Sequence, residues 1–188
     1  MKRSTRVASV PPNIASPIPI QLMRATLKRG ELSLQPLLLN IVIEEVLRLI
    51  KADLIGRGIT VIEQLSADLP AVKGDRVQLQ QAVLNLVLNA AEAMAANEPG
   101  SRRRLITTMR CGDTARVSVR DQGPGLPEDV DPLFKPFLTT KDQGLGMGLA
   151  ICRSIIAAHH GHLWAEAHPE RGAVFQFELP VADSQANP

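Results

Sequence analysis

The chain has 188 residues, with 21 lysines and arginines against 19 aspartates and glutamates, and 45% of its residues are hydrophobic. This length suits one domain with a single core, and the composition excludes a wholly disordered chain. Two cysteines, Cys111 and Cys152, are too few for a disulfide framework, so we expect a reducing, cytoplasmic setting. We expect no membrane segment, because Asn40 interrupts the most apolar run well short of the roughly 18 residues that a span needs.

Charge is unevenly distributed along the chain. Residues 1–30 contain six basic and no acidic side chains, which leaves 15 basic and 19 acidic residues in 31–188. Four prolines predict an unfolded leader up to Ile20, and Ile20–Lys28 predicts one or two helical turns ended by Gly30. A basic arm suits nucleic acid, an acidic membrane surface or a transit peptide, but a solvated terminus is the simpler interpretation.

Two helices are predicted in the first half of the remaining chain, with a strand at Ile59–Leu65 between them. Apolar residues at helical spacing predict an amphipathic helix through Ile43 and Ile50 that ends before Gly56. The second helix is expected to start at an Asp75 cap, with Gln78 reaching back, and to run to about Ala96. Its apolar stripe contains Leu79, Val83, Leu86, Val87, Ala90 and Met94, and its polar stripe contains Gln78, Gln81, Asn85, Asn89 and Glu92.

The second half of the chain predicts a hairpin, a helix and a closing hairpin. The first hairpin turns at Gly112-Asp113, between strands 105–110 and 116–120. A helix beginning near Leu149 follows a stretch rich in glycine and proline, and strands 162–167 and 174–179 close the chain. We therefore expect an α+β fold, a two-layer α/β sandwich in which helices cover one face of a mixed, mainly antiparallel sheet.

Three short motifs point to ligand chemistry. Asn85 and Asn89 lie one turn apart, and a carboxamide oxygen is a suitable ligand for Mg²⁺ beside substrate phosphates, although a solvated helix face shows the same pattern. The second motif, Asp121-Gln-Gly123-Pro-Gly125, directly follows a strand. An acid at this position can accept a hydrogen bond from an exocyclic amine, and the glycines let the backbone approach a flat ligand. A simple tight turn shows the same pattern. The third motif, Gly144-Leu-Gly146-Met-Gly148-Leu149, opens a helix and so directs N–H groups at an anion.

In this order, and with Phe134-Lys-Pro-Phe-Leu-Thr-Thr-Lys141 between the last two, the motifs resemble a known family. It is the ATP-binding catalytic domain of sensor histidine kinases, within the superfamily of gyrase B, Hsp90 and MutL, and most similar to nitrogen-regulation and oxygen-sensing kinases. The resemblance covers about residues 31–180 and implies a Bergerat-type fold. We therefore assign a leader with a dimerisation-helix remnant to 1–30, the catalytic domain to 31–182 and a tail to 183–188.

The resemblance implies roles for individual residues. Asn89 would coordinate Mg²⁺ bridging the ATP phosphates with support from Asn85, Asp121 would bind the adenine amino group, and Gly123 and Gly125 would shape the wall beside the base. Residues from about 127 to 144 would form a lid. Phosphate or lid roles would fall to Thr139, Thr140, Lys141, Gly144, Gly146, Gly148 and Leu149. Two departures from the family pattern are Glu92, where many members have a basic residue, and Gly161-His162 in place of paired glycines.

The acceptor histidine of such a kinase is not evident in the chain. His159, His160, His162 and His168 are not followed by an acid, and we interpret them as surface or turn residues, with a metal site the lesser alternative. We therefore expect the partner to be a histidine-containing dimerisation domain, in cis or in trans, and the response regulator to be an indirect partner.

The sequence is also compatible with other functions, within and outside the superfamily. ATP-hydrolysing clamps place a glutamate where this chain has Asn85, so slow hydrolysis is expected. A non-catalytic, nucleotide-responsive module anchored by the basic arm is a second alternative, although the arm lacks aromatics and we expect no nucleic-acid partner. A serine kinase is disfavoured because the segment at residues 133–141, which the resemblance identifies as the family's phenylalanine box, is intact.

Overall fold

A computed structural model describes residues 32–98, 102–136 and 147–182 of the protein. The expectations for the basic arm and for Ile20–Lys28 lie outside these residues. The helices of the described part are α2 (Leu39–Gly56), α3 (Arg76–Ala93), α4 (Gly148–Ala158) and the 3-10 helix η1 (Asp131–Phe134). The strands are β1 (Gln35–Leu37), β2 (Thr60–Gln64), β3 (Val72–Gly74), β4 (Arg103–Cys111), β5 (Thr114–Arg120), β6 (His162–Ala167) and β7 (Ala173–Pro180).

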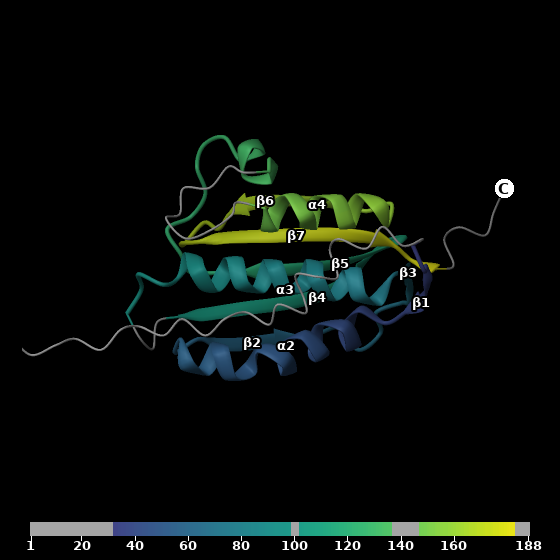
Figure 1. Cartoon of the computed structure of the whole chain (residues 1–188), viewed down its shortest axis with the longest axis horizontal. Coiled ribbons are helices and arrows are strands. Elements are labelled where there is room, and N and C mark those ends of the chain that lie inside the picture. The colour runs from purple at the N-terminus through teal and green to yellow at the C-terminus, as the bar shows by residue number, and fades with distance from the viewer. Residues whose placement is uncertain (1–31, 99–101, 137–146, 183–188) are drawn as a thin grey trace, which may run out of the picture.

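A five-stranded sheet in the order β2-β4-β5-β7-β6 forms one layer. Only β2 and β4 pair in parallel within it, and the other neighbours are antiparallel. The three α-helices lie together over one face of this sheet (Figure 1). Alternation along β5 and β7 buries every second side chain beneath the helices, as at Val117, Val119, Phe175 and Phe177. The predicted two-layer α+β fold is confirmed.

A second sheet, not predicted from the sequence, pairs β1 with β3 in antiparallel orientation. Each of its strands has only three residues, and β1 contains Pro36. Segments this short carry too little alternation to be recognised as strands, so the pairing follows from the surrounding packing.

Helix α3 is the central helix, and its two stripes fall as predicted. The Asp75 carboxylate accepts from the backbone N–H groups of Val77 and Gln78, so the cap is confirmed. All six predicted apolar-stripe residues are fully buried, whereas the polar-stripe residues stay partly or wholly exposed. The helix ends at Ala93, earlier than the predicted Ala96, because Met94–Ala96 form turns instead.

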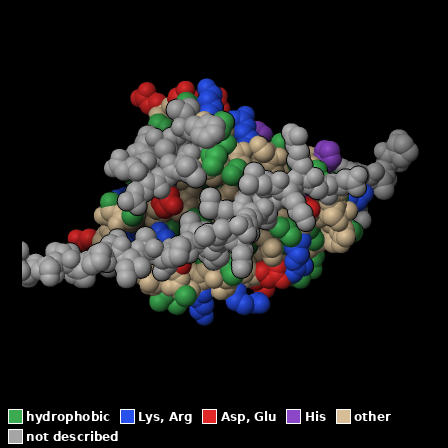
Figure 2. Space-filling model, viewed as in Figure 1, with side chains coloured by type: hydrophobic (Ala, Val, Ile, Leu, Met, Phe, Trp, Pro, Cys, Tyr) green, Lys and Arg blue, Asp and Glu red, His purple; other side chains and the backbone are tan. Residues whose placement is uncertain are grey.

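Side-chain contacts join α2 to α3 at their solvent edge. The Glu45 carboxylate of α2 pairs with the Arg76 guanidinium and accepts from the Gln80 amide at 2.8 Å, both at the start of α3. Along the edge that α2 forms, acidic and basic side chains lie close together (Figure 2). None of the helices in 32–98, 102–136 and 147–182 has the length and apolarity needed to cross a membrane.

The prediction that the four histidines are surface or turn residues applies to His159 only as a turn residue, because its side chain is not at the surface. This side chain is only 2% exposed, and its Nε2 accepts from the backbone N–H of Asp75 at 2.9 Å. Its Nδ1 lies 2.7 Å from the Ile155 carbonyl, so Nδ1 carries the proton and donates. His159 therefore ties the end of α4 to the residue that caps α3. Nothing in local sequence distinguishes it from the exposed neighbour His160.

We expect His159→Ala to lower the free energy of unfolding by about 2–4 kcal/mol, because it leaves a buried cavity and a buried N–H without its acceptor. Urea denaturation monitored by circular dichroism measures the change. His160→Asn is the matched control: residue 160 is exposed with φ +59°, a conformation that asparagine tolerates, so its effect should be below about 0.5 kcal/mol. Equal effects of the two substitutions would contradict this role of His159.

Candidate functional site

Asp121 is held rigidly at the end of β5, on the helix-covered face of the sheet. Its side chain is only 1% exposed. Its Oδ1 accepts from the backbone N–H of Gly123 at 2.7 Å and from that of Ala173 at 3.3 Å. The Asp121 N–H in turn donates to the Ala173 carbonyl at 2.9 Å. These bonds place one buried carboxylate where β5, β7 and the first glycine motif meet.

Glycines are required around this carboxylate because the backbones approach closely. A Cβ added to Gly123 would lie 2.9 Å from both the Ala93 carbonyl oxygen and the Asp121 Oδ1. A Cβ at Gly172 would collide with the Asp121 carbonyl, and Gly172 has φ +90°. Gly125 has φ +99°, and an added Cβ would meet only the Gly172 carbonyl oxygen, at an ordinary contact distance of 3.8 Å. The predicted role of Gly123 and Gly125 in shaping this wall is compatible with these positions but is not tested by them.

Two arginines that no motif predicted hold Asn97, just after the end of α3, and one of them also reaches this glycine motif. The Arg171 guanidinium donates to the Gly123 carbonyl at 3.2 Å and to Asn97 Oδ1 at 3.1 Å. The Arg102 guanidinium donates to the Asn97 and Ala95 carbonyls, close to the negative end of the α3 dipole. The basic run at 102–104 was the only sequence signal for Arg102, and no motif pointed to Arg171. It did not reveal which of its members point inward.

Asn85 and Asn89 both lie half-buried on the polar stripe of α3. The Asn85 amide Nδ2 lies 3.4 Å from the carbonyl oxygen of Gly148, and Gly148 is the first residue of α4. Asn85 also hydrogen-bonds the buried Cys152 thiol. Burial raises the pKa of this thiol to about 12, so the thiol stays protonated at neutral pH. Asn85 therefore joins α3 to the second glycine motif, and its supporting role at a cation site stays a prediction.

The N-terminus of α4 has no side-chain cap within the described part of the chain. Met147 occupies the capping position, and its side chain makes no capping hydrogen bond. The exposed Gly148 and the half-buried Leu149 begin the helix, and this end carries the positive end of its dipole. The predicted site residues Thr139, Thr140, Lys141, Gly144 and Gly146 lie outside the described residues.

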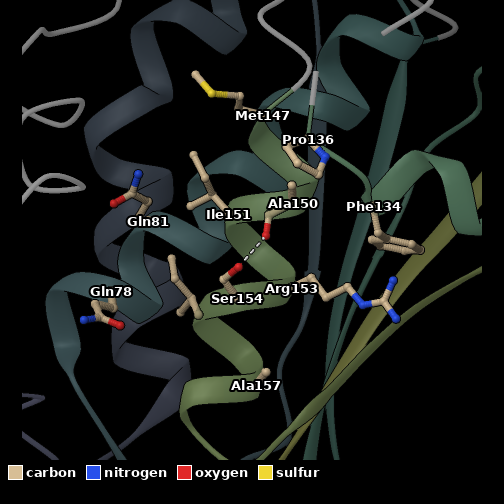
Figure 3. A pocket seen from close by; sticks show the side chains of 11 residues that line it. Gln78, Gln81, Phe134, Pro136, Met147, Ala150, Ile151, Arg153, Ser154 and Ala157 are labelled. Carbon is tan, nitrogen blue, oxygen red and sulfur yellow. Dashed lines mark hydrogen bonds between the residues drawn. The ribbon is translucent and has the colours of Figure 1, made fainter. Parts of the chain in front are cut away.

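A cavity of about 660 Å³ lies between α3, α4 and η1 (Figure 3). Gln78 and Gln81 of α3 line one side, and Phe134 of the phenylalanine box lines another. Pro136 and Met147 also line it, although ten residues separate them in the sequence. The cavity thus adjoins the polar stripe of α3 but does not include Asn89 or Asp121.

The described residues fit a nucleotide and one divalent cation. A buried acceptor beside a glycine that leaves no room for a side chain suits a flat, amine-bearing base. A carboxamide such as that of Asn89 suits Mg²⁺, which keeps several waters and takes few protein ligands. An uncapped helix N-terminus suits phosphate.

Comparison with known families agrees with this geometry. The family described as "Histidine kinase-, DNA gyrase B-, and HSP90-like ATPase" matches residues 74–183, more than half of the chain. The chain belongs to this ATPase family. The matched region of this histidine kinase-like ATPase contains α3, Asp121, both glycine motifs and α4.

Curated relatives of this histidine kinase-like ATPase are sensor kinases. The chain is 39% identical over 166 residues to the sensor histidine kinase TmoS of Ectopseudomonas mendocina, which covers 87% of the chain and 17% of TmoS. It is 42% identical over 167 residues to the sensor protein FixL of Bradyrhizobium diazoefficiens, covering 87% of the chain and 32% of FixL. The chain therefore spans about a third or less of these relatives.

Solved structures show the same domain. The catalytic domain of histidine kinase ThkA superposes with a TM-score of 0.71 at 37% identity, covering 79% of this chain and 95% of that domain. Full-length ShkA in complex with AMPPNP gives a TM-score of 0.71 at 30% identity, covering 87% of this chain and 34% of ShkA. The chain is thus a histidine kinase-type ATPase catalytic domain in both sequence and fold.

We expect Gly123→Ala to destabilise the fold by about 1–3 kcal/mol, because its Cβ would push against the Ala93 carbonyl and the Asp121 carboxylate. Thermal and urea unfolding measure the effect. Gly56→Ala at the end of α2 is the matched control, since its Cβ meets nothing within 4 Å and alanine favours helix. If Gly123→Ala were as stable as Gly56→Ala, the close approach at Gly123 would be refuted.

Proposed function

We propose that this domain binds ATP with Mg²⁺ and presents the γ-phosphate to a histidine on a separate domain or chain. The observation that carries the proposal is the buried Asp121 carboxylate, held between Gly123 and Ala173 beside a glycine that a side chain cannot replace. An ionised carboxylate accepts hydrogen bonds only, which suits the exocyclic amine of adenine. The solved complex of the related ShkA with AMPPNP supports a nucleotide at this kind of site.

The other residues would then act on the phosphates. Asn89, one turn after Asn85 on α3, would hold the cation, whose chemistry is to neutralise charge on the phosphate oxygens. The uncapped start of α4 at Gly148 and Leu149 would offer N–H groups to the phosphates. Binding, positioning and charge neutralisation are most of what phosphoryl transfer requires from a protein.

Transfer to a protein acceptor is favoured over hydrolysis by the position of Asn85. A carboxamide cannot act as the general base that would activate water. Its described contacts are instead to Gly148 and to the Cys152 thiol. We therefore propose that the domain turns over ATP slowly when no acceptor is present.

The relatives and the cysteines support proposals about the acceptor and the cellular setting. Since the chain spans a third or less of TmoS and FixL, we propose that a histidine-bearing dimerisation domain supplies the acceptor, in cis or in trans. The related ThkA has been solved in complex with the response regulator protein TrrA, which supports an indirect response-regulator partner. Cys111 and Cys152 are both free thiols, which suits a reducing cytoplasm.

Mixing the full chain with a separate histidine-bearing dimerisation domain and γ-labelled ATP tests this function. We expect label on the dimerisation domain that is acid-labile and stable to base, and that requires Mg²⁺. A dimerisation domain with its acceptor histidine changed to glutamine is the control and should stay unlabelled. Rapid release of inorganic phosphate by the chain alone would instead support the hydrolysing clamp.

We expect Asn89→Ala to weaken ATP binding at least about tenfold in magnesium buffer, equivalent to about 1.4 kcal/mol, but to change it little in EDTA. The reason is that only the metal-dependent part of the affinity passes through this carboxamide. Calorimetric titration in both buffers measures the two effects. Gln81→Ala, a truncation of a similar amide on the same polar stripe of α3, is the matched control. An equal loss in EDTA would show that Asn89 is not the metal ligand.

A further inference from the structure

A second buried charge lies next to Asp121. The Arg104 side chain on β4 is 0% exposed, although arginine is among the residues that are least often fully buried. Its Nε, Nη1 and Nη2 atoms are buried without a hydrogen-bond partner among the described residues. Burying a guanidinium in this way is costly unless an opposite charge or a function compensates for it.

Strand register places Arg104 directly beside Asp121. In the antiparallel β4–β5 ladder Leu105 pairs with Arg120, so the next residues of the two strands are Arg104 and Asp121. Both side chains are buried, and Arg104 lies on the same face of β4 as the buried Ile106, beneath the helices. Directly opposed residues on one face interact, and opposite charges there attract.

Electrostatics agree with this placement. Burial lowers the pKa of Arg104 to about 10, attraction to Asp121 opposes that change, and Arg57 adds to the lowering. A pKa near 10 leaves the guanidinium charged at neutral pH. The Asp121 carboxylate therefore has a permanent cation beside it, in a region from which water is excluded.

We propose that Arg104 is a positioning residue for base selection: its buried positive charge keeps Asp121 ionised, so that Asp121 accepts from a 6-amino purine and rejects a 6-oxo purine. This inference rests on the proposed role of Asp121 in the nucleotide site. Burial disfavours a charged carboxylate, whereas the Gly123 and Ala173 N–H donors and the neighbouring cation favour it, so Arg104 supplies the charge-dependent part of what keeps Asp121 ionised. A neutral carboxylic acid would donate a hydrogen bond from its O–H to a 6-oxo group and so lose its preference for the amine.

The alternative is that Arg104 only fills space. A packing role depends on side-chain volume, whereas the proposed role depends on charge. Arg104→Met keeps the length and removes the charge, Arg104→Gln keeps polar donors and removes the charge, and Arg104→Lys retains the charge. Arg103→Met is the matched control, because Arg103 is the preceding residue of β4 and is exposed.

Calorimetric titration of the full chain with ATP and with ITP in magnesium buffer tests the inference. ITP differs at the 6-position, where an oxo group replaces the amine. We expect the wild type, Arg103→Met and Arg104→Lys to share one ATP-over-ITP preference to within about threefold. Arg104→Met and Arg104→Gln should lose at least about tenfold of that preference while circular dichroism shows a folded domain.

Asp121→Asn separates this inference from the function on which it rests. If Arg104 acts through Asp121, the double variant Arg104→Met/Asp121→Asn should have the same nucleotide preference as Asp121→Asn alone. Failure of the wild type to bind ATP would overturn the proposed function. Loss of preference in Asp121→Asn but not in folded Arg104→Met or Arg104→Gln would overturn only the role of Arg104. If Arg104→Met does not fold, the comparison of Arg104→Gln with Arg104→Lys decides the same question.

Discussion

The backbone hydrogen bonds to the Asp121 carboxylate are the constraint on which the rest of the site depends. The N–H groups of Gly123 and Ala173 both donate to Oδ1, so the end of β5, the start of β7 and the first glycine motif share one acceptor. A carboxylate held in this way cannot rotate freely, and its direction is set before any ligand arrives. Preorganisation of this kind reduces the ordering that binding would otherwise require.

The sheet and the helices each contribute a different part of the site. The β5–β7 pairing supplies the rigid carboxylate, whereas α3 carries the asparagines along a stripe that faces away from the core. Arg171 then joins Asn97, just after α3, to Gly123 of the glycine motif, and Arg102 also holds Asn97. The distance between Asp121 and the asparagines of α3 is therefore set by packing between the two layers.

Buried polar side chains recur where elements of this fold meet. His159 joins α4 to the α3 cap, and Asn40 of α2 connects Ser66 and Thr108 in a closed set of hydrogen bonds. A buried polar group without a partner is costly, so each of these contacts specifies one relative placement of its elements. Arg104 differs because its guanidinium has no hydrogen-bond partner among the residues that the structure describes, and the compensation comes from the charge of Asp121.

Local pattern was enough to predict α3, its Asp75 cap, both hairpins and the fold class, because these depend on periodicity and on neighbouring residues. The order of the motifs identified the family, whereas the roles that the resemblance implied for Asp121, Gly123 and Asn85 stay predictions. The sequence did not reveal that Arg104 and His159 are buried, since similar neighbours, Arg103 and His160, are exposed. Burial of a polar side chain is decided by residues that are distant in sequence, such as Asp121 and Asp75, and only the tertiary structure brings these together.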